Sequence, residues 1–522
     1  MASARRLPCG KVPWELVASK VCGALPPEVL RGPACGEDAA LVRMGDELWA
    51  VASDPITFTA RDAGRLVVLV NANDVAASGA RPRFFTAVVL VGPEAAEPAR
   101  IAGVLAEIRT TCARLGVTLI GGHTEVTPGL PRGILVGTML GRVVDRPLAT
   151  GGLREGDRIG ITKFAGLEGT SILLGEFGER AARACSADAL AAAARILHGD
   201  WLSIVPEAEI AWSEGAVTAL HDVTEGGVGE ALHEMAAASG RELSVRAEAI
   251  PVLEATRALG EALGMDPLGL IGSGALLVGC APAGADRLEA AYRAAGIPFT
   301  WIGRAGAAQA VPSTGVARFA RDEVLKAWLL DGIDAVLFDM DGTLVDSKYD
   351  WPAIREALEI QGHSILDELD AMPSPRREEK WALLERFERE ASLKARLKDG
   401  AKELVAVVRA RGLKTALVTN NSGGSVALIL ERYGLQFDAL VTRDSGLYKP
   451  SGAPLVEALR QLGVAPERSL FVGDYLFDVV AARAAGCARV GILYDPEGRF
   501  SRDADFTFPD VNALRRHLEF VL

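Results

Sequence analysis

The segment that most constrains the fold of this chain is AVLFDMDG, residues 335–342, in which four apolar residues precede two aspartates. The apolar run predicts a buried strand that ends where Asp339 and Asp341 emerge. Gly342 allows a tight backbone turn directly after them. Because open α/β sheets place ligands at the carboxyl ends of their strands, this pattern predicts a site at that edge of a parallel sheet.

The rest of the chain alternates strand-like apolar runs with helical runs rich in Ala, Leu and Glu, which predicts an α/β protein. A length of 522 residues suggests three or four domains. The composition shifts near Asp145–Glu155 and again at Val311–Arg321, where the pattern is poorly periodic. We therefore expect a first domain, a second domain, a linker and a third domain at residues 1–150, 151–315, 316–332 and 333–522.

Composition excludes several classes of function. The net charge is -12, from 68 acidic and 56 basic residues without a long Lys/Arg run, so we expect no nucleic-acid partner and no membrane-surface partner. The seven cysteines form no CxxC pair, which favours a reducing, cytoplasmic location over a disulfide scaffold. Neither a signal peptide nor a membrane span is expected, because the longest uncharged stretch, residues 267–285, is broken by glycines and prolines.

The two aspartates after the predicted strand suit phosphoryl chemistry. A carboxylate at Asp339 can attack phosphorus to give an aspartyl-phosphate, which water then hydrolyses. Asp341 can protonate the leaving oxygen and later deprotonate that water. Taken singly, each aspartate could equally be a helix cap or part of a solvated turn.

Later segments supply the other groups that this chemistry needs. Thr419 follows a second predicted strand, residues 415–418, and its hydroxyl can bond a phosphoryl oxygen. Lys449 can place a cation against the phosphate charge. Asp474 and Asp478 follow a third apolar strand and offer the hard oxygen ligands that Mg²⁺ prefers. Four such motifs in this order argue against the helix-cap alternative.

The order of these motifs resembles the haloacid dehalogenase superfamily, in particular its phosphoglycolate phosphatase branch, over about residues 333–522. The resemblance implies a Rossmann-like parallel sheet, a small helical cap at about residues 349–398 and a small phosphorylated metabolite as substrate. It also implies that Asp339 is the nucleophile and Asp341 the general acid and base. It further implies that Thr419 and Lys449 bind the phosphoryl group. The implied Mg²⁺ ligands are Asp339, Asp474 and the main-chain carbonyl of Asp341, with Asp478 as a supporting carboxylate.

The N-terminal two thirds carry their polar residues in short islands. These are CGEDAA, SDP, NANDVAASGA, GGHTEVTPG, TKFAGLEGTSIL and HDVTEGGV. Asn71, Asp74 and Ser78 recur at helical spacing in an apolar helix and need polar partners, which a metal–phosphate cluster would supply. Asp222 precedes a Gly-Gly turn and a helix predicted from about Val228, whose N-terminus favours anions. No GxxxxGK[ST] loop occurs here, so a nucleotide would have to bind through carboxylate-held Mg²⁺.

These islands resemble the superfamily of aminoimidazole ribonucleotide synthetase over about residues 10–310, with the nearest likeness to its hydrogenase expression/formation type. The resemblance implies a two-part unit of α+β halves that binds ATP and several Mg²⁺ ions in a homodimer formed through the N-terminal domain. It implies metal carboxylates at Asp38, Asp54 and Asp74, and nucleotide-binding residues at Asn71, Gly121, Gly122, His123 and Asp222. Gly121, Gly122 and His123 are expected in a loop that follows a strand at Val117–Ile120, and His123 stands where many relatives have aspartate.

Three readings of the whole chain stay open. It is a bifunctional enzyme, or a phosphatase whose N-terminal half only senses nucleotide or dimerises, or a maturation scaffold without catalysis. The hydrogenase-maturation enzyme uses a cysteine at its extreme C-terminus, whereas this chain ends Glu519-Phe520-Val521-Leu522, so that chemistry is not expected. Cys35, beside the GED motif, is a nucleophile or an inert thiol. The spacing of His221 and His233 argues against a zinc pair.

Overall fold

The computed structural model describes the chain from residue 10 to residue 521 except 60, 131, 198–199, 320, 348, 363–364, 496–498 and 501–502. Its contacts divide the chain into two compact units. The first contains residues 10–261 and 265–325, and the second contains residues 262–264 and those from 326 onward. Among the described residues, every helix is too short or too polar to cross a membrane.

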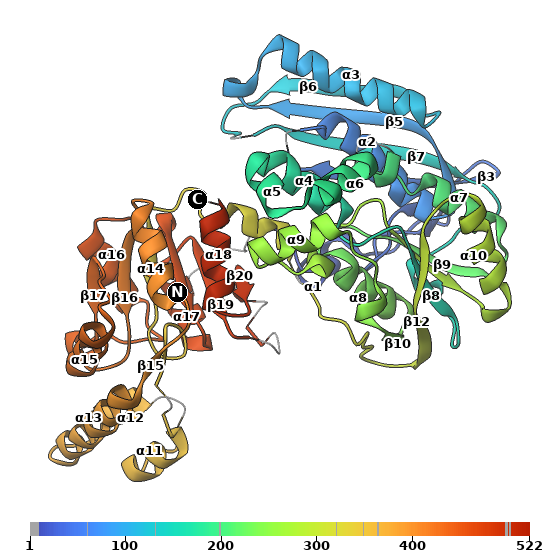
Figure 1. The fold of residues 1–522 in the computed structure, drawn as a ribbon. Coiled ribbons are helices and arrows are strands. Elements are labelled where there is room, and N and C mark those ends of the chain that lie inside the picture. The colour runs from blue at the N-terminus through green and yellow to red at the C-terminus, as the bar shows by residue number, and fades with distance from the viewer. Residues whose placement is uncertain are drawn as a thin grey trace. The chain divides into compact units, whose positions relative to one another are not determined.

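Two β-sheets build the first unit (Figure 1). The strands of the larger sheet are β1 (Val29–Arg31), β2 (Ala40–Met44), β3 (Glu47–Ala52), β4 (Pro55–Ile56), β5 (Ala80–Val91), β6 (Thr118–Val126) and β7 (Ile134–Val143). Those of the smaller sheet are β8 (Arg158–Thr162), β9 (Val217–Asp222), β10 (Arg241–Val245), β11 (Leu276–Cys280) and β12 (Phe299–Ala308). The sheet orders are β1-β2-β3-β7-β5-β6, with β4 beside β7, and β10-β12-β8-β11-β9.

Helices flank both sheets of the first unit. They are α1 (Trp14–Val21), α2 (Ala63–Ala77), α3 (Pro98–Arg114), α4 (Leu167–Phe177), α5 (Glu179–Ala184), α6 (Ala187–Leu197), α7 (Val205–Ser213), α8 (Gly227–Ser239), α9 (Glu254–Leu263) and α10 (Ala285–Ala294). Helix α2 is buried along nearly its whole length, because its Val, Leu and Ala side chains pack against β5 and β7. The three polar residues Asn71, Asn73 and Asp74 are therefore carried into the interior of the unit.

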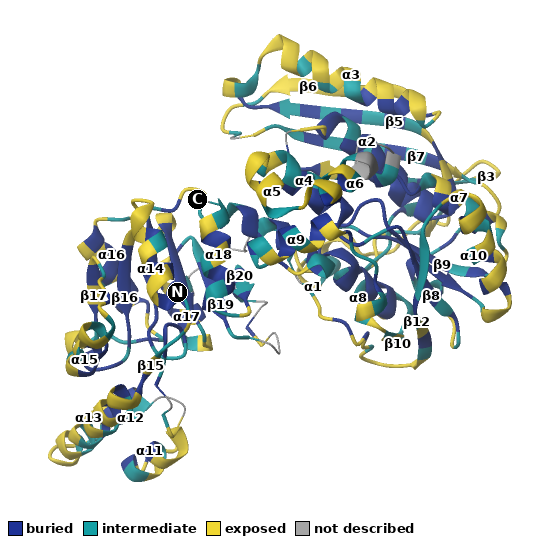
Figure 2. Cartoon of the chain, in the orientation of Figure 1, coloured by how far each residue is buried: buried dark blue, intermediate teal, exposed yellow. Residues whose placement is uncertain are grey.

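Strand β6 differs from its neighbours because all nine of its residues are exposed, whereas those of β5 alternate with the core (Figure 2). We expected a strand only as far as Ile120, with a loop from Gly121, and this was wrong. Parallel pairing with β5 continues to Val126, so Gly121, Gly122 and His123 lie inside the strand. At Gly122, where φ is +151°, an added Cβ would lie 2.0 Å from the carbonyl oxygen of Ala87. Close strand pairing therefore accounts for this glycine.

The second unit contains a six-stranded, fully parallel sheet. Its strands are β13 (Ala335–Phe338), β16 (Lys414–Val418), β17 (Ala439–Val441), β18 (Ser469–Gly473), β19 (Arg489–Leu493) and β20 (Phe506–Phe508), in the order β17-β16-β13-β18-β19-β20. Helices α14 (Ala401–Ala410), α15 (Gly423–Tyr433), α16 (Ala453–Leu462), α17 (Leu476–Ala485) and α18 (Val511–Val521) accompany it. Strand β13 matches the predicted bounds, and the α/β class is confirmed.

A helical insert interrupts this second unit after β13. It contains α11 (Trp351–Leu358), α12 (Ile365–Ala371) and α13 (Arg376–Lys394) and has a small apolar core of its own. The chain enters and leaves the insert through β14 (Val345–Asp346) and β15 (Arg396–Leu397), which pair antiparallel. This insert, which we call the cap, is separated by this two-stranded stem from the parallel sheet (Figure 1).

Candidate functional site

Strand order brings the motifs of the second unit together. Strand β13 lies between β16 and β18, so residues that follow these three strands meet at one edge of the sheet. Asp339 follows β13 directly and is 7% exposed. Nζ of Lys449 lies 2.5 Å from Oδ1 of Asp339 and 2.6 Å from Oδ1 of Asp478. One buried ammonium therefore joins two of the predicted carboxylates.

Three carboxylates form a candidate cation site at this edge. One oxygen each of Asp339, Asp474 and Asp478 lie within 4.8 Å of one another. Asp478 is committed elsewhere, since its Oδ2 accepts the backbone N–H groups of Asp474 and Tyr475, at 3.0 Å each. Thr343 donates to Oδ1 of Asp474 at 2.9 Å. Free oxygens of Asp339 and Asp474 are thus the ones best placed for a divalent cation.

Gly342 shapes the same corner. Its φ is +82°, and a Cβ added there would lie 2.1 Å from Oδ2 of Asp474. A side chain at this position would therefore displace a carboxylate of the cation site. The hard oxygen donors of Asp339 and Asp474 fit Mg²⁺.

Asp341 has its own set of partners. Ser347 donates to its Oδ1, and Asn421 donates to its Oδ2 at 2.5 Å. Burial raises the pKa of Asp341 to about 7, and the nearby charge of Asp339 acts in the same direction. Burial also raises the pKa of Asp339 to about 7, despite Lys449. A carboxyl group at position 341 can therefore exist in both protonation states near neutral pH.

The segment after β16, residues 419–421, holds Lys449 and Asp341 in position through hydrogen bonds. Asn420 exchanges two hydrogen bonds with the main chain of Lys449, at 2.8 and 2.9 Å, which fixes the start of the lysine side chain. Thr419 is 3% exposed and accepts the backbone N–H of Asn421 at 3.3 Å. Sequence reasoning missed Asn421 and Ser347 as partners of Asp341. The two consecutive asparagines after the strand could have revealed the first, whereas nothing in the pattern marks Ser347.

The cap contacts the site through two polar links. The hydroxyl of Tyr349, at the start of the cap, donates to Oδ1 of Asn421 at 3.2 Å. Glu388 of α13 forms a buried ion pair with Arg443, whose Nη2 lies 3.0 Å from Oε2. The same Glu388 oxygen accepts the backbone N–H of Ser422 at 3.4 Å. The cap is therefore anchored beside the carboxyl edge of the sheet.

In the first unit, four of the predicted aspartates form a separate acidic cluster. Burial, and then the charges of Asp54, Asp222 and Asp38, raise the pKa of Asp74 well above its usual value. Burial and Asp38 do the same for Asp222. Oδ2 of Asp74 and both carboxyl oxygens of Asp222 have no hydrogen-bond partner among the described residues. Buried, unpartnered carboxylates of this kind require protons or cations.

Two residues hold this acidic cluster in place. His221 contacts Oδ1 of Asp38 at 2.8 Å and Oε2 of Glu234 at 3.2 Å. Although burial opposes protonation, the two carboxylates raise the pKa of His221 to about 10. Asn71 accepts the backbone N–H of Asp54 at 2.9 Å and donates to carbonyl oxygens of Asp54 and Val67. Asn71 therefore orients Asp54, and its amide is fully engaged by the protein itself.

Three other residues that the sequence singles out in the first unit have surroundings that differ from those of the acidic cluster. His123 is 64% exposed in its side chain and contacts Glu125 at 3.2 Å, on the open strand β6. His233 contacts the carbonyl oxygen of Val316 rather than His221. Burial raises the pKa of the Cys35 thiol, which favours the inert reading of that residue.

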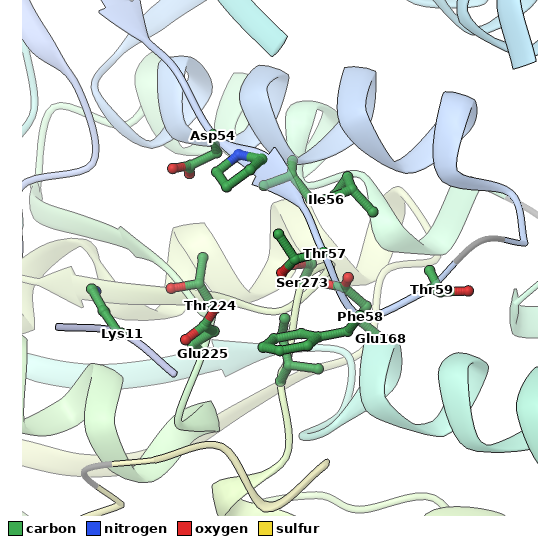
Figure 3. Close-up of a pocket in the computed structure, with 13 residues that line it drawn as sticks. Lys11, Asp54, Ile56, Thr57, Phe58, Thr59, Glu168, Thr224, Glu225 and Ser273 are labelled. Carbon is green, nitrogen blue, oxygen red and sulfur yellow. The ribbon is translucent and has the colours of Figure 1, made fainter. Parts of the chain in front are cut away.

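A pocket of about 300 Å³ opens beside the acidic cluster (Figure 3). Lys11, Asp54 and Glu225 lie at one part of its wall, and Glu168 and Ser273 at another. Lys11 also donates to Oε1 of Glu234 at 2.9 Å. Lys11 and Ser273 lie in no motif that the sequence singles out, and Glu168 lies in the island TKFAGLEGTSIL without a spacing that marks it as a site residue. Its lining combines carboxylates, one ammonium and apolar side chains.

Comparison with known proteins finds different families in the two parts of the chain. Family models match the AIR synthase related protein, N-terminal domain, at residues 36–143, and its C-terminal domain at residues 154–313. A model of the haloacid dehalogenase-like hydrolase matches residues 333–486.

Individual relatives fall into the same two groups. The carbamoyl dehydratase HypE of Azotobacter vinelandii is 33% identical over 246 residues, which are 46% of this chain and 68% of that protein. The phosphoglycolate phosphatase of Chromobacterium violaceum is 31% identical over 213 residues, 35% of this chain and 96% of the relative. The N-acetylmuramic acid 6-phosphate phosphatase of Pseudomonas aeruginosa is 33% identical over 193 residues, 31% of this chain and 82% of the relative. The chain therefore belongs to the AIR synthase-related family through its first unit and to the haloacid dehalogenase-like hydrolases through its second.

Proposed function

We propose that the second unit is a Mg²⁺-dependent phosphomonoester hydrolase that acts through an aspartyl-phosphate at Asp339. The observation that carries this proposal is the contact of Lys449 with both Asp339 and Asp478, beside Asp474, at the end of the central strand. A nucleophilic carboxylate, a cation for the phosphate charge and spare carboxylate oxygens for a metal are what this reaction needs. Two phosphatases among the relatives support the same reaction class.

The reaction follows from the placement of two carboxyl groups. A carboxylate oxygen of Asp339 bonds to phosphorus as the bond from phosphorus to the ester oxygen breaks. The carboxyl group of Asp341 gives its proton to that leaving oxygen and so releases the alcohol. Asp341 then takes a proton from water, whose oxygen attacks the phosphorus and frees the Asp339 carboxylate together with inorganic phosphate.

The surrounding residues hold this geometry. Asn421 and Ser347 fix both oxygens of Asp341. Lys449 offers an ammonium to the phosphoryl oxygens, and Thr419 lies buried at the end of the neighbouring strand. Asp339, Asp474 and the main-chain carbonyl of Asp341 would hold Mg²⁺, which would neutralise phosphoryl charge during transfer. The cap beside the site would select among small phosphorylated metabolites.

Replacing Asp339 with Asn tests the assignment, because it removes the nucleophile at nearly constant shape. We expect loss of phosphate release from every substrate found in a screen of phosphorylated metabolites, run with and without ATP. The matched control is Glu457→Gln, which changes a half-buried carboxylate that accepts hydrogen bonds from Arg460 and Gln461 on α16. Phosphatase activity retained by the Asp339→Asn protein would refute the proposal.

For the first unit we propose an ATP site that uses carboxylate-held Mg²⁺. Its support is the convergence of Asp38, Asp54, Asp74 and Asp222, with unpartnered buried oxygens on the last two. Such a cluster can be neutralised by divalent cations that bridge to a polyphosphate. ATP turnover is measured in the Asp339→Asn background, where the phosphatase is silent. Adding Asp74→Asn should abolish both turnover and Mg²⁺-ATP binding.

The outcome separates the readings of the first unit. Turnover that depends on Asp74 means a bifunctional enzyme. Binding without turnover means a nucleotide sensor, and the absence of both would contradict an ATP site. We further propose that the unit forms a homodimer through β6, whose exposed edge includes Leu119, Ile120 and Val126 at 41%, 56% and 49% exposure. An apolar exposed edge strand is a surface that proteins ordinarily cover.

A further inference from the structure

A chain of hydrogen bonds leads from the cap to the carboxyl group that is proposed as general acid and base. The hydroxyl of Tyr349 donates to Oδ1 of Asn421 at 3.2 Å, and Nδ2 of the same asparagine donates to Oδ2 of Asp341 at 2.5 Å. Tyr349 lies between β14 and α11, at the start of the cap. A cap residue therefore reaches the Asp341 carboxyl group through one intervening amide.

The main chain of Asn421 is held without any help from Tyr349. Its N–H donates to Oγ1 of Thr419 at 3.3 Å, and its carbonyl oxygen accepts the backbone N–H of Arg443 at 3.0 Å. The whole residue is 6% exposed. The place of the side-chain amide is therefore set by its own backbone, and what remains to be set is which end of the amide faces Asp341.

The two ends of this amide are similar in size but opposite in hydrogen-bonding character, because the oxygen accepts and the nitrogen donates. In the described part of the chain, Tyr349 is the donor to Oδ1. Burial, and then the charges of Asp341 and Glu388, raise the pKa of Tyr349 far above its usual value, so the hydroxyl keeps its proton. The bond from Tyr349 therefore favours the orientation in which Nδ2 points to Asp341.

This orientation matters for the proton that Asp341 transfers. With Nδ2 toward it, the carboxyl group accepts hydrogen bonds from Asn421 and Ser347, and the hydrogen of its protonated form stays available to the leaving oxygen. With the amide turned, a protonated Asp341 would donate that hydrogen to Oδ1 instead. An ionised Asp341 would then face a second acceptor, which is unfavourable. The turned amide therefore impairs both protonation states that the reaction uses.

We propose that Tyr349 is a positioning residue for proton transfer, which acts through Asn421 to keep the amide nitrogen toward Asp341. This proposal rests on the proposed phosphatase function of the second unit. The ring of Tyr349 has a separate structural role, because it stacks on Trp351 with the ring centroids 4.7 Å apart. Since only the hydroxyl is assigned to positioning, Tyr349→Phe removes the proposed effect and keeps the stacked ring.

The test compares two phosphomonoesters in the full-length protein. Benzyl phosphate releases an alkyl alcohol that needs a proton, whereas p-nitrophenyl phosphate releases a stable phenolate. Tyr349→Phe should lower kcat/KM for benzyl phosphate about three- to tenfold, the loss expected for one hydrogen bond, and should change kcat/KM for p-nitrophenyl phosphate less than about twofold. The inhibition constant of inorganic phosphate should stay within about twofold, since this amide is not used to bind phosphate. Equal losses with both esters, or no loss with benzyl phosphate, would overturn the proposal.

Further variants assign the effect to the bond between Tyr349 and Asn421. Asn421→Ala should lower kcat/KM for benzyl phosphate at least about tenfold, and adding Tyr349→Phe should then change it less than about twofold. The matched control is Tyr433→Phe, because the hydroxyl of Tyr433 donates to the carbonyl oxygen of Ala395, at the end of the cap, at 2.8 Å. It should leave the ratio of the two kcat/KM values unchanged. Additive losses in the double variant would contradict a route through Asn421.

Unfolding temperatures test the same bond without any substrate. Tyr349→Phe should lower the unfolding temperature of the second unit by about 2–4 °C in the otherwise wild-type protein, and by less than about 1 °C in the Asn421→Ala protein. Equal shifts in the two backgrounds would overturn the link. A wild-type protein without phosphatase activity would refute the proposed function and this role with it. An active wild-type protein in which Tyr349→Phe keeps its full activity on benzyl phosphate would overturn the positioning role alone.

Discussion

Lys449 donates a 2.5 Å hydrogen bond from Nζ to Oδ1 of Asp339 inside a site that excludes nearly all solvent. The same ammonium contacts Asp478, and these two carboxylates together raise the pKa of Lys449, against the effect of burial. The lysine is therefore charged at neutral pH. It serves two purposes, because it compensates buried carboxylates before substrate arrives and faces the phosphate when it does.

Replacing Lys449 with Met should remove both effects. Loss of one partner of a buried ion pair costs about 3–5 kcal/mol, because an uncompensated charge is left behind. The pKa of Asp339 is raised to about 7 in the folded protein, so its carboxyl group becomes charged as the pH rises through that value. The free energy of unfolding that is lost with Lys449 should therefore grow over the same pH range. Thermal unfolding at pH 6 and pH 8, with EDTA present, measures it. Lys402→Met, at an exposed position of α14, should leave the unfolding temperature unchanged, and equal shifts in both variants would contradict the explanation.

The pH dependence should follow Asp341. Its pKa is raised to about 7, and it must be protonated to donate to the leaving oxygen, so kcat/KM for an alkyl phosphate should fall as pH rises above about 7. p-Nitrophenyl phosphate leaves as a stable phenolate without a proton and should lack most of this decline. Asp341→Asn should therefore lower kcat/KM for both substrates by different factors. The loss for the alkyl phosphate should be at least about tenfold larger than the loss for p-nitrophenyl phosphate. Equal losses with both substrates would argue against a general acid at this position.

Mg²⁺ should stabilise the second unit. Asp339 is buried and Asp474 is half-buried, and burial raises the pKa of Asp474 to about 6, so a cation would relieve the repulsion between these two carboxylates. Ligand linkage gives about 2.7 kcal/mol at a Mg²⁺ concentration of 100 Kd. Differential scanning calorimetry should show a higher unfolding temperature of the second unit in MgCl₂ than in EDTA. Asp474→Asn should largely remove this difference. A Mg²⁺ effect of the same size in that variant would place the cation elsewhere.

The cap depends on a buried ion pair. Glu388 and Arg443 are 4% and 7% exposed, and Arg443 also lies over the ring of Trp381 at 4.7 Å. Glu388→Gln leaves the guanidinium without its charge partner, which should cost about 3–5 kcal/mol and loosen the cap. The measured signs are a lower unfolding temperature and faster proteolysis within residues 349–398. The surface pair of Glu457 and Arg460, whose side chains are 28% and 72% exposed, supplies the control, since Glu457→Gln should change neither quantity.

The fold of the second unit could be predicted from the sequence because its candidate site residues directly follow the ends of strands. The four apolar residues 335–338 predict a buried strand, and the residue that follows such a strand lies at the carboxyl edge of the sheet. That rule placed Asp339 and Asp474 correctly near each other without any knowledge of side-chain contacts. It did not predict that Asp478 binds two backbone N–H groups and Lys449, since hydrogen-bond geometry has no signature in residue type.

The first unit was harder to predict because its polar residues come from distant islands. The helical spacing of Asn71 and Asp74 placed both inside, but not the use of Asn71 on the backbone of Asp54. The expected loop at Gly121 was a strand, because pairing with β5 decided the local structure. Glu168 lies in the island TKFAGLEGTSIL, but only the folded chain shows that its carboxyl group lies beside Ser273 in a pocket.

The exposed strand β6 gives the last prediction. If it forms the dimer contact, a charge at its most exposed apolar residue should be buried without a partner, which is strongly unfavourable. We expect Ile120→Lys to convert a wild-type dimer into a monomer in light scattering coupled to gel filtration at micromolar concentration. Val311→Lys provides the comparison, because Val311 is 89% exposed in the segment after β12 and should not affect assembly. A wild-type protein that is already monomeric, or an Ile120→Lys protein that stays dimeric, would show that this edge is covered by something other than a second copy.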